Sequence, residues 1–160
     1  MIHYILTIKS PGEPVYSNIL TSVYQKHDLD VNLVAGVLQA LNTFSNEVFK
    51  EEATKIILEH YDILIYRLLK DHIIIFIIDR NDMSSHPVIG DIVANINLAI
   101  KRNGDMNKED FSKMINEIVI KALEREYEEF GLTDLLNLTK QLQKEIVYPI
   151  REEALEKTEL

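Results

Sequence analysis

Six consecutive apolar residues, Ile73 to Ile78, constrain the fold more than any other feature of this sequence. The run is far shorter than the ~20 apolar residues that a membrane-spanning helix requires. It does not alternate between apolar and polar residues, so a strand built from it must be apolar on both faces. Such a strand belongs at the centre of a sheet that helices cover on each side. We therefore expect one sheet between two helical layers, with the apolar strand Ile2 to Ile8 beside it.

The other elements follow from changes of hydrophobic period and from turn residues. Ser10 to Pro14 supplies a strong turn, Asp28 or Asp30 can cap the first helix, and Ser84 or Ser85 can cap the second. The expected elements are strands at residues 1–8 and from 15 onward, a helix to about 49, strands at roughly 53–60, 63–69 and 72–79, a helix ending near 103–104, and a helix ended by Gly131. This order predicts an α+β fold with a five-stranded antiparallel sheet.

The last part of the chain reads as an extension of that domain. Thr133 can cap a further helix, which Pro149 interrupts. Its apolar stripe is Leu135, Leu138, Leu142 and Ile146. We expect a core domain over residues 1–131 and an amphipathic helical extension over residues 132–160.

Charge and composition exclude several classes of function. A net charge of −9 without a cluster of basic residues opposes nucleic-acid binding. Cysteine is absent, which excludes disulfides, thiolate metal sites and a cysteine nucleophile within this chain and favours a reducing compartment. The first residues lack the basic prelude and the length of a signal peptide. We expect a cytoplasmic protein whose membrane contact is at most peripheral, through partners.

The element order and several local patterns resemble a longin domain. These patterns are a strand at the very N-terminus, a Gly-containing turn followed by Val15 and Tyr16, and a first helix that contains the segment Val37 to Phe44. The resemblance covers about residues 1–130 and implies a sheet between one helix and two. The related roadblock family begins with an extra helix, whereas strand residues here start at Ile2. The resemblance further implies a non-enzymatic adaptor that takes small-GTPase, trafficking, longin or roadblock partners and needs no cofactor.

Two groups of polar residues could carry chemistry. His3, His60 and His72, with Asp62 and Asp71, could converge at one end of the sheet as a metal site or an acid–base pair, although His and Asp at strand ends more commonly serve turns.

The segment Asp79, Asn81 and Asp82 is similar to the start of a calcium-binding loop. However, Ser84 stands where an EF-hand needs glycine, and Gly90 where it needs glutamate. Phosphate-binding loops, nucleophile elbows and helical zinc pairs lack their usual motifs. We therefore expect no enzyme activity, metal or cofactor.

The first helix has an apolar arc of about 220°, wider than packing on one sheet requires. Val37 and Phe44 lie near the middle of the arc, and we expect them to face the sheet. The expected subunit interface is Val31, Val34, Ala35, Leu38, Leu41 and Phe49. On this interpretation a charge at Val34 or Leu38 weakens association, whereas a charge at Val37 or Phe44 unfolds the domain. The alternative is that another part of the same chain covers the surplus.

The sequence favours a scaffold or adaptor that dimerises through its first helix and binds a small GTPase or trafficking partner. The alternative is a small-molecule-sensing domain, because such a fold can hold a ligand between sheet and helices. A hydrolase that uses His and Asp residues is a third possibility. A fully packed core would exclude the second class, and scattered His and Asp residues would exclude the third.

Overall fold

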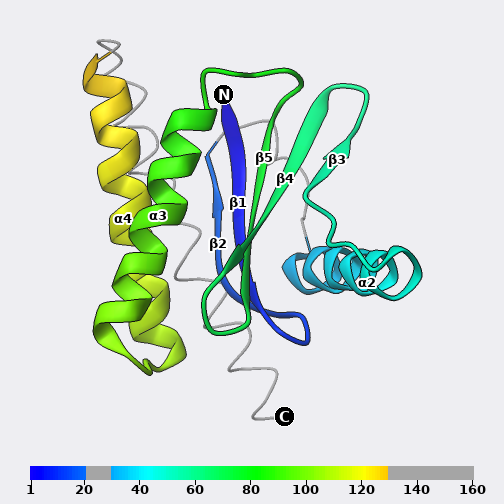
Figure 1. Ribbon diagram of the computed structural model, residues 1–160. Coiled ribbons are helices and arrows are strands. Elements are labelled where there is room, and N and C mark those ends of the chain that lie inside the picture. The colour runs from blue at the N-terminus through cyan, green and yellow to red at the C-terminus, as the bar shows by residue number, and fades with distance from the viewer. Residues whose placement is uncertain (21–29, 130–160) are drawn as a thin grey trace.

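The computed structural model describes residues 1–20 and 30–129, which form a three-layer α+β fold (Figure 1). The strands are β1 (Ile2–Lys9), β2 (Glu13–Ile19), β3 (Lys55–Ile57), β4 (Tyr61–Leu68) and β5 (His72–Asp79). They form one antiparallel sheet in the order β2-β1-β5-β4-β3. Helix α2 (Val31–Phe49) lies on one face, and α3 (His86–Asn103) and α4 (Lys108–Glu129) cover the other. The expected fold class is confirmed.

The central pair of strands is β1 and β5, as the apolar run predicts. Ile5 lies opposite Phe76, and both pack on the side of α3 and α4. Leu6 lies opposite Ile75, and both pack on the side of α2. Both faces of each central strand are therefore buried, which is why the run Ile73 to Ile78 does not alternate in sequence.

Strand β3 is shorter than the sequence predicts. It has three residues and ends at Ile57, because Leu58 N donates to Tyr61 O at 2.8 Å and closes a tight turn. Strand β4 consequently starts at Tyr61. The turn leaves β3 as a short strand at one edge of the sheet.

The two long connections into helices use carboxylates. Asp30 caps α2 by accepting hydrogen bonds from Asn32 N at 3.0 Å and Leu33 N at 3.1 Å. At α3, Ser85 occupies the cap position, as expected, but its side chain makes no cap hydrogen bond. Asp82 accepts from the backbone N–H groups of both serines instead.

The expected C-terminal helix and the boundary near residue 131 lie outside the described residues. Among the helices within residues 1–20 and 30–129, none is long and apolar enough to cross a membrane.

Candidate functional site

Helix α2 carries an apolar stripe on the side that faces away from the sheet. Leu33, Val37, Leu41, Phe44 and Val48 recur at helical spacing, and their exposed fractions range from 43% to 65%. At 1.5 Å per residue the stripe is about 22 Å long. Figure 1 shows α2 on the opposite side of the sheet from α3 and α4, so neither of those helices covers the stripe.

The side of α2 that packs on the sheet is different from the one expected. Ala35 and Leu38 are buried in a cluster with the α2-facing residues of β1, β4 and β5, and Val31 and Val34 pack against that cluster. Four of the six expected interface residues therefore face the sheet. The other two, Leu41 and Phe49, are exposed.

Val37 and Phe44 are exposed, so the expectation that they face the sheet is wrong. The physical reason is that an apolar arc of about 220° leaves too little polar surface to orient a helix by hydrophobicity alone. Close approach to the β1–β2 turn favours the observed orientation. A Cβ atom placed on Gly12 would lie 3.3 Å from Gln39 Cβ and 3.9 Å from Ala35 O. The turn therefore lies in close contact with the side of the helix that carries Ala35 and Gln39.

Charge is almost absent from α2. Glu47 is the only charged residue among the 19 residues of the helix. In the C-terminal half of the helix, the partly buried residues on the side towards the sheet are polar but uncharged. They are Gln39, Asn42 and Ser45. With Glu47 as its one exposed charge, the outward face of the helix has nearly the composition of an interface core, where charged residues are depleted.

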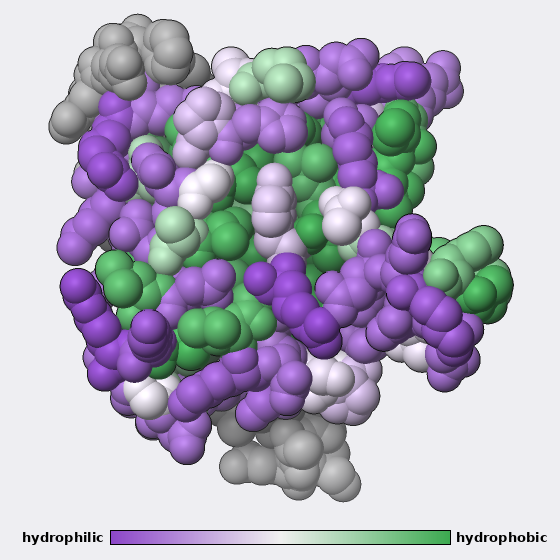
Figure 2. All heavy atoms as spheres, viewed as in Figure 1, coloured by the Kyte–Doolittle hydropathy of each residue, from purple (hydrophilic) through white to green (hydrophobic). Residues whose placement is uncertain are grey.

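Further exposed apolar residues lie at the end of α2 and at the edge of the sheet. Phe44 and Phe49 contact each other edge to face, with ring centroids 6.1 Å apart. Ile57 of β3 and Leu58 after it are exposed at the sheet edge. Figure 2 shows apolar side chains at the outer end of α2 and over the β3–β4 hairpin.

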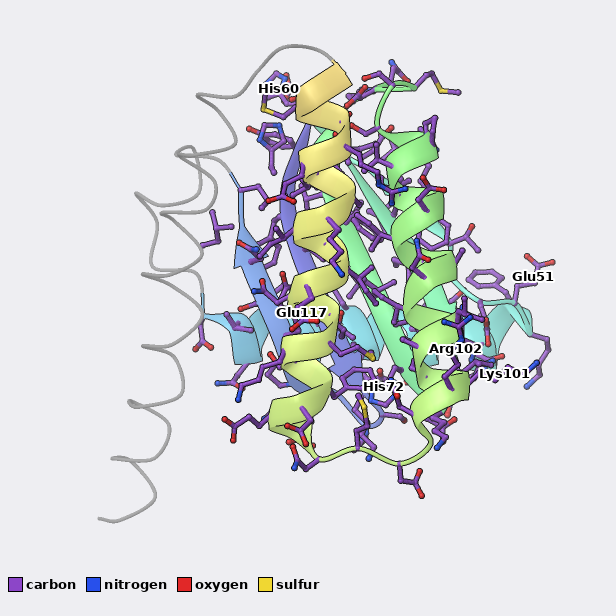
Figure 3. The ribbon with its side chains drawn as sticks, turned by 90° about the vertical axis from the view of Figure 1, so that its left-hand side faces the viewer. Glu51, His60, His72, Lys101, Arg102 and Glu117 are labelled. Carbon is purple, nitrogen blue, oxygen red and sulfur yellow. The ribbon has the colours of Figure 1, made fainter. Side chains whose placement is uncertain are left out.

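The histidines do not form one cluster. His3 Nε2 lies 2.7 Å from Asp79 Oδ1, and His60 and Asp62 belong to the same end of the sheet. His72 and Asp71 belong to the opposite end, as the positions of His60 and His72 show in Figure 3. No group of three His, Asp or Glu residues suited to a metal ion occurs in the part of the chain that the structure describes.

The segment from Asp79 to Asp82 acts as a helix cap and as a turn. Asp82 accepts from Ser84 Oγ and Ser85 Oγ, both at 2.5 Å. Burial acts to raise the pKa of Asp82, but hydrogen bonds from the amino group of Met1 and from both serines outweigh it and hold the pKa well below its usual range. Asn81 N donates to the buried Asp62 at 3.2 Å. The carboxylates of Asp62 and Asp82 therefore stabilise the turn and the start of α3.

A pocket of about 170 Å³ opens at the other end of the sheet, between the β1–β2 turn and the α3–α4 connection. Its polar lining is Lys9, Glu13, Lys70, His72, Asp105 and Lys108. Sequence reasoning placed His72 in the wrong group and missed the lysines. The available signal was that Lys9 and Lys70 each stand at the end of a strand beside a turn.

No protein-family model and no curated protein matches this sequence. Solved structures include similar chains, one of them in the structure described as "Homology model of the full-length AP-3 complex in a stretched open conformation". That chain is 18% identical, the match covers 82% of this chain and 98% of that one, and the TM-score is 0.48.

Proposed function

We propose that this chain is a non-enzymatic protein-interaction module that associates with a second copy of itself through the outward face of α2. The observation that carries the proposal is the stripe Leu33, Val37, Leu41, Phe44 and Val48, whose members are 43% to 65% exposed. Contiguous exposed apolar surface with a polar surround is typical of binding sites.

A protein partner fits this face better than a membrane. Helices that lie on membrane surfaces carry Lys and Arg along their polar side, which attract anionic lipids. Helix α2 contains no basic residue. The nearest one is Lys50, which follows the helix at the C-cap. The face offers apolar contact without the positive charge that a lipid surface selects.

A second copy of the chain fits for reasons of charge and symmetry. Each copy has a net charge of −9, so two copies repel one another, and a face whose side chains carry no charge adds least to that repulsion. The stripe is such a face, and in a two-fold dimer the same patch meets itself. A specific interface buries about 800 Å² on each partner, more than one helix margin supplies. The exposed Ile57 and Leu58 at the neighbouring sheet edge would add to it.

The finer proposal concerns the class of partner beyond the dimer. We propose an adaptor or scaffold of longin type that binds a small GTPase or another trafficking protein, at most peripheral to membranes through such partners. Its support is the order of strands and helices, which the longin resemblance implies. A longin or roadblock partner on the same face would replace the second copy.

The test is sedimentation equilibrium of the wild-type chain beside Val37→Glu and Thr43→Glu. We expect wild type to dimerise at tens of micromolar and Val37→Glu to weaken the dimer at least about 100-fold, because burying an unpaired charge costs several kcal/mol and 1.4 kcal/mol is about tenfold. Thr43→Glu is the matched control. It adds the same charge to the same helix, at an exposed position beside the stripe.

Both variants should remain folded by circular dichroism, since each replaces an exposed residue. A wild-type chain that stays monomeric at these concentrations would overturn the proposed self-association. Equal weakening by Val37→Glu and Thr43→Glu would show that general charge repulsion, not the stripe, controls association.

A small-molecule-sensing role is the second proposed function. The observation that favours it is the pocket of about 170 Å³ beside His72. This pocket is lined by residues of the α3 and α4 side of the sheet, away from α2, so the two functions are separable.

A further inference from the structure

The pocket near His72 has the opposite charge balance from the chain. Three lysines, Lys9, Lys70 and Lys108, face two carboxylates, Glu13 and Asp105, which gives three positive charges against two negative ones. The whole chain has a net charge of −9. A local positive excess in an acidic protein favours an anionic ligand at this point of the surface.

Two of the three lysines are already paired. Lys70 Nζ lies 2.6 Å from Asp105 Oδ1, and Lys108 Nζ lies 3.1 Å from Glu13 Oε1. These ion pairs tie the rim of the pocket together from the β4–β5 turn, the α3–α4 connection, β2 and α4. Lys9 makes no ion pair with the described residues, and its charge acts on Asp105 only from a distance. Its charge is the one that a ligand would compensate.

His72 forms part of the pocket wall and is held in place. Its ring stacks on Phe111 with centroids 4.3 Å apart, and its side chain is buried. Nδ1 lies 3.2 Å from Leu69 O, which can only accept, so Nδ1 carries the hydrogen. Burial lowers the pKa of His72, and the nearby positive charge of Lys9 lowers it further.

We propose that this pocket binds a small oxyanion, a carboxylate or phosphate group, beside Lys9 and His72. The volume of about 170 Å³ admits several non-hydrogen atoms, since a water molecule occupies about 30 Å³. Val15, Ile100 and Met106 add apolar wall for a short carbon chain. The site lies on the other face of the sheet from α2 and does not depend on the proposed dimer.

Binding couples to the protonation of His72. The charged groups around it are Lys9 from β1, Glu13 from β2, Lys70 and Asp71 from the turn, Asp105 from the α3–α4 connection and Lys108 from α4. An anion opposes the effect of Lys9 and stabilises the imidazolium, so it raises the pKa of His72. By linkage, protonation of His72 tightens anion binding, and affinity rises as the pH falls.

The experiment follows the histidine ring resonances of the full chain by NMR while sodium sulfate or sodium butyrate is added. Sulfate stands in for a phosphate group because phosphate itself changes charge near pH 6. We expect a saturable shift of His72 with at least one of the two anions and none with sodium chloride at equal ionic strength. His60, exposed at the other end of the sheet, is the internal reference (Figure 3). With sulfate we expect tighter binding at about pH 5.5 than at about pH 7.5.

Two variants separate the pocket from general charge. Lys9→Gln should abolish the saturable shift, whereas Lys101→Gln, which removes an exposed charge from the end of α3, should leave it unchanged. The proposal is overturned if both anions act like chloride, or if Lys9→Gln binds as tightly as wild type while its spectrum remains that of a folded chain. Saturation by butyrate alone identifies a carboxylate site, and saturation by sulfate alone identifies a phosphate-type site.

Discussion

The carboxylate of Asp82 organises the start of α3 by accepting several hydrogen bonds at once. It receives the backbone N–H groups of Ser84 and Ser85 at 3.0 Å and 3.4 Å, and the hydroxyl groups of both serines. These donors include groups that the first turn of a helix would otherwise leave without partners. One residue thereby fixes both the β5–α3 turn and the entry of the helix.

Replacing Asp82 by Ala should lower the free energy of unfolding by about 1 kcal/mol, the usual cost of losing a capping side chain. Asp91→Ala removes the same charge from an exposed position of α3 and is the matched control. The folded pKa of Asp82 is depressed, so its stabilisation is complete above the unfolded pKa of about 4 and fades as the pH falls towards the folded value. Urea denaturation at pH 7 and at about pH 2.5 measures this. A difference between the two variants that does not shrink in acid would contradict the capping role.

Helix α2 packs on the sheet with one side and exposes the other. Leu38 lies on the inner side, packed with the cluster on the α2 face of the sheet. Leu41 lies on the outer side and is 43% exposed. The two leucines stand three residues apart on one helix. Substituting each in turn therefore compares the same change at a buried and at an exposed position in nearly the same backbone.

Leu38→Ala should lower the free energy of unfolding by about 2–3 kcal/mol, because it removes a buried side chain and leaves a cavity. Leu41→Ala should change it by less than about 1 kcal/mol, since a surface substitution loses little packing. Urea denaturation at submicromolar concentration, where association does not contribute, compares the two. The opposite order of the two effects would mean that α2 packs on the sheet through its other side.

The bounds of α2 were predictable, but its orientation was not. Asp30 marks the start by its capping side chain, and the last apolar residue, Phe49, marks the end. These signals are local. The orientation depends on contact with a turn distant in sequence, where Gly12 lies close to Ala35 and Gln39. A wide apolar arc does not contain that information, which is why the predicted interface residues divided between the two sides.

At the scale of the whole molecule, the antiparallel sheet decides which polar residues meet. Strand β5 runs from His72 to Asp79 and spans about 23 Å at 3.3 Å per residue. Strand β1 is antiparallel to it, so His3 near its start meets Asp79, and Lys9 at its end meets His72. The strand order was predictable from the apolar runs. The pairing of His3 with Asp79 also follows from that order. The histidines considered together in the sequence do not meet because they belong to both ends of the sheet.

Salt should act in opposite directions on the two proposed sites. Two copies that each carry a charge of −9 repel one another, and salt screens this repulsion, since the Debye length falls from about 10 Å at 0.1 M to about 3 Å at 1 M. An interface made by the uncharged stripe of α2 gains no charge pairs that salt could weaken. The dimer should therefore tighten several-fold when sodium chloride rises from about 0.05 M to about 0.5 M, while sulfate binding beside Lys9 weakens. Sedimentation equilibrium measures how the dimer dissociation constant changes with salt, and the histidine titration measures how sulfate affinity changes with salt on the same samples. A dimer that loosens with salt would place ion pairs in the interface and exclude the stripe of α2 as its centre.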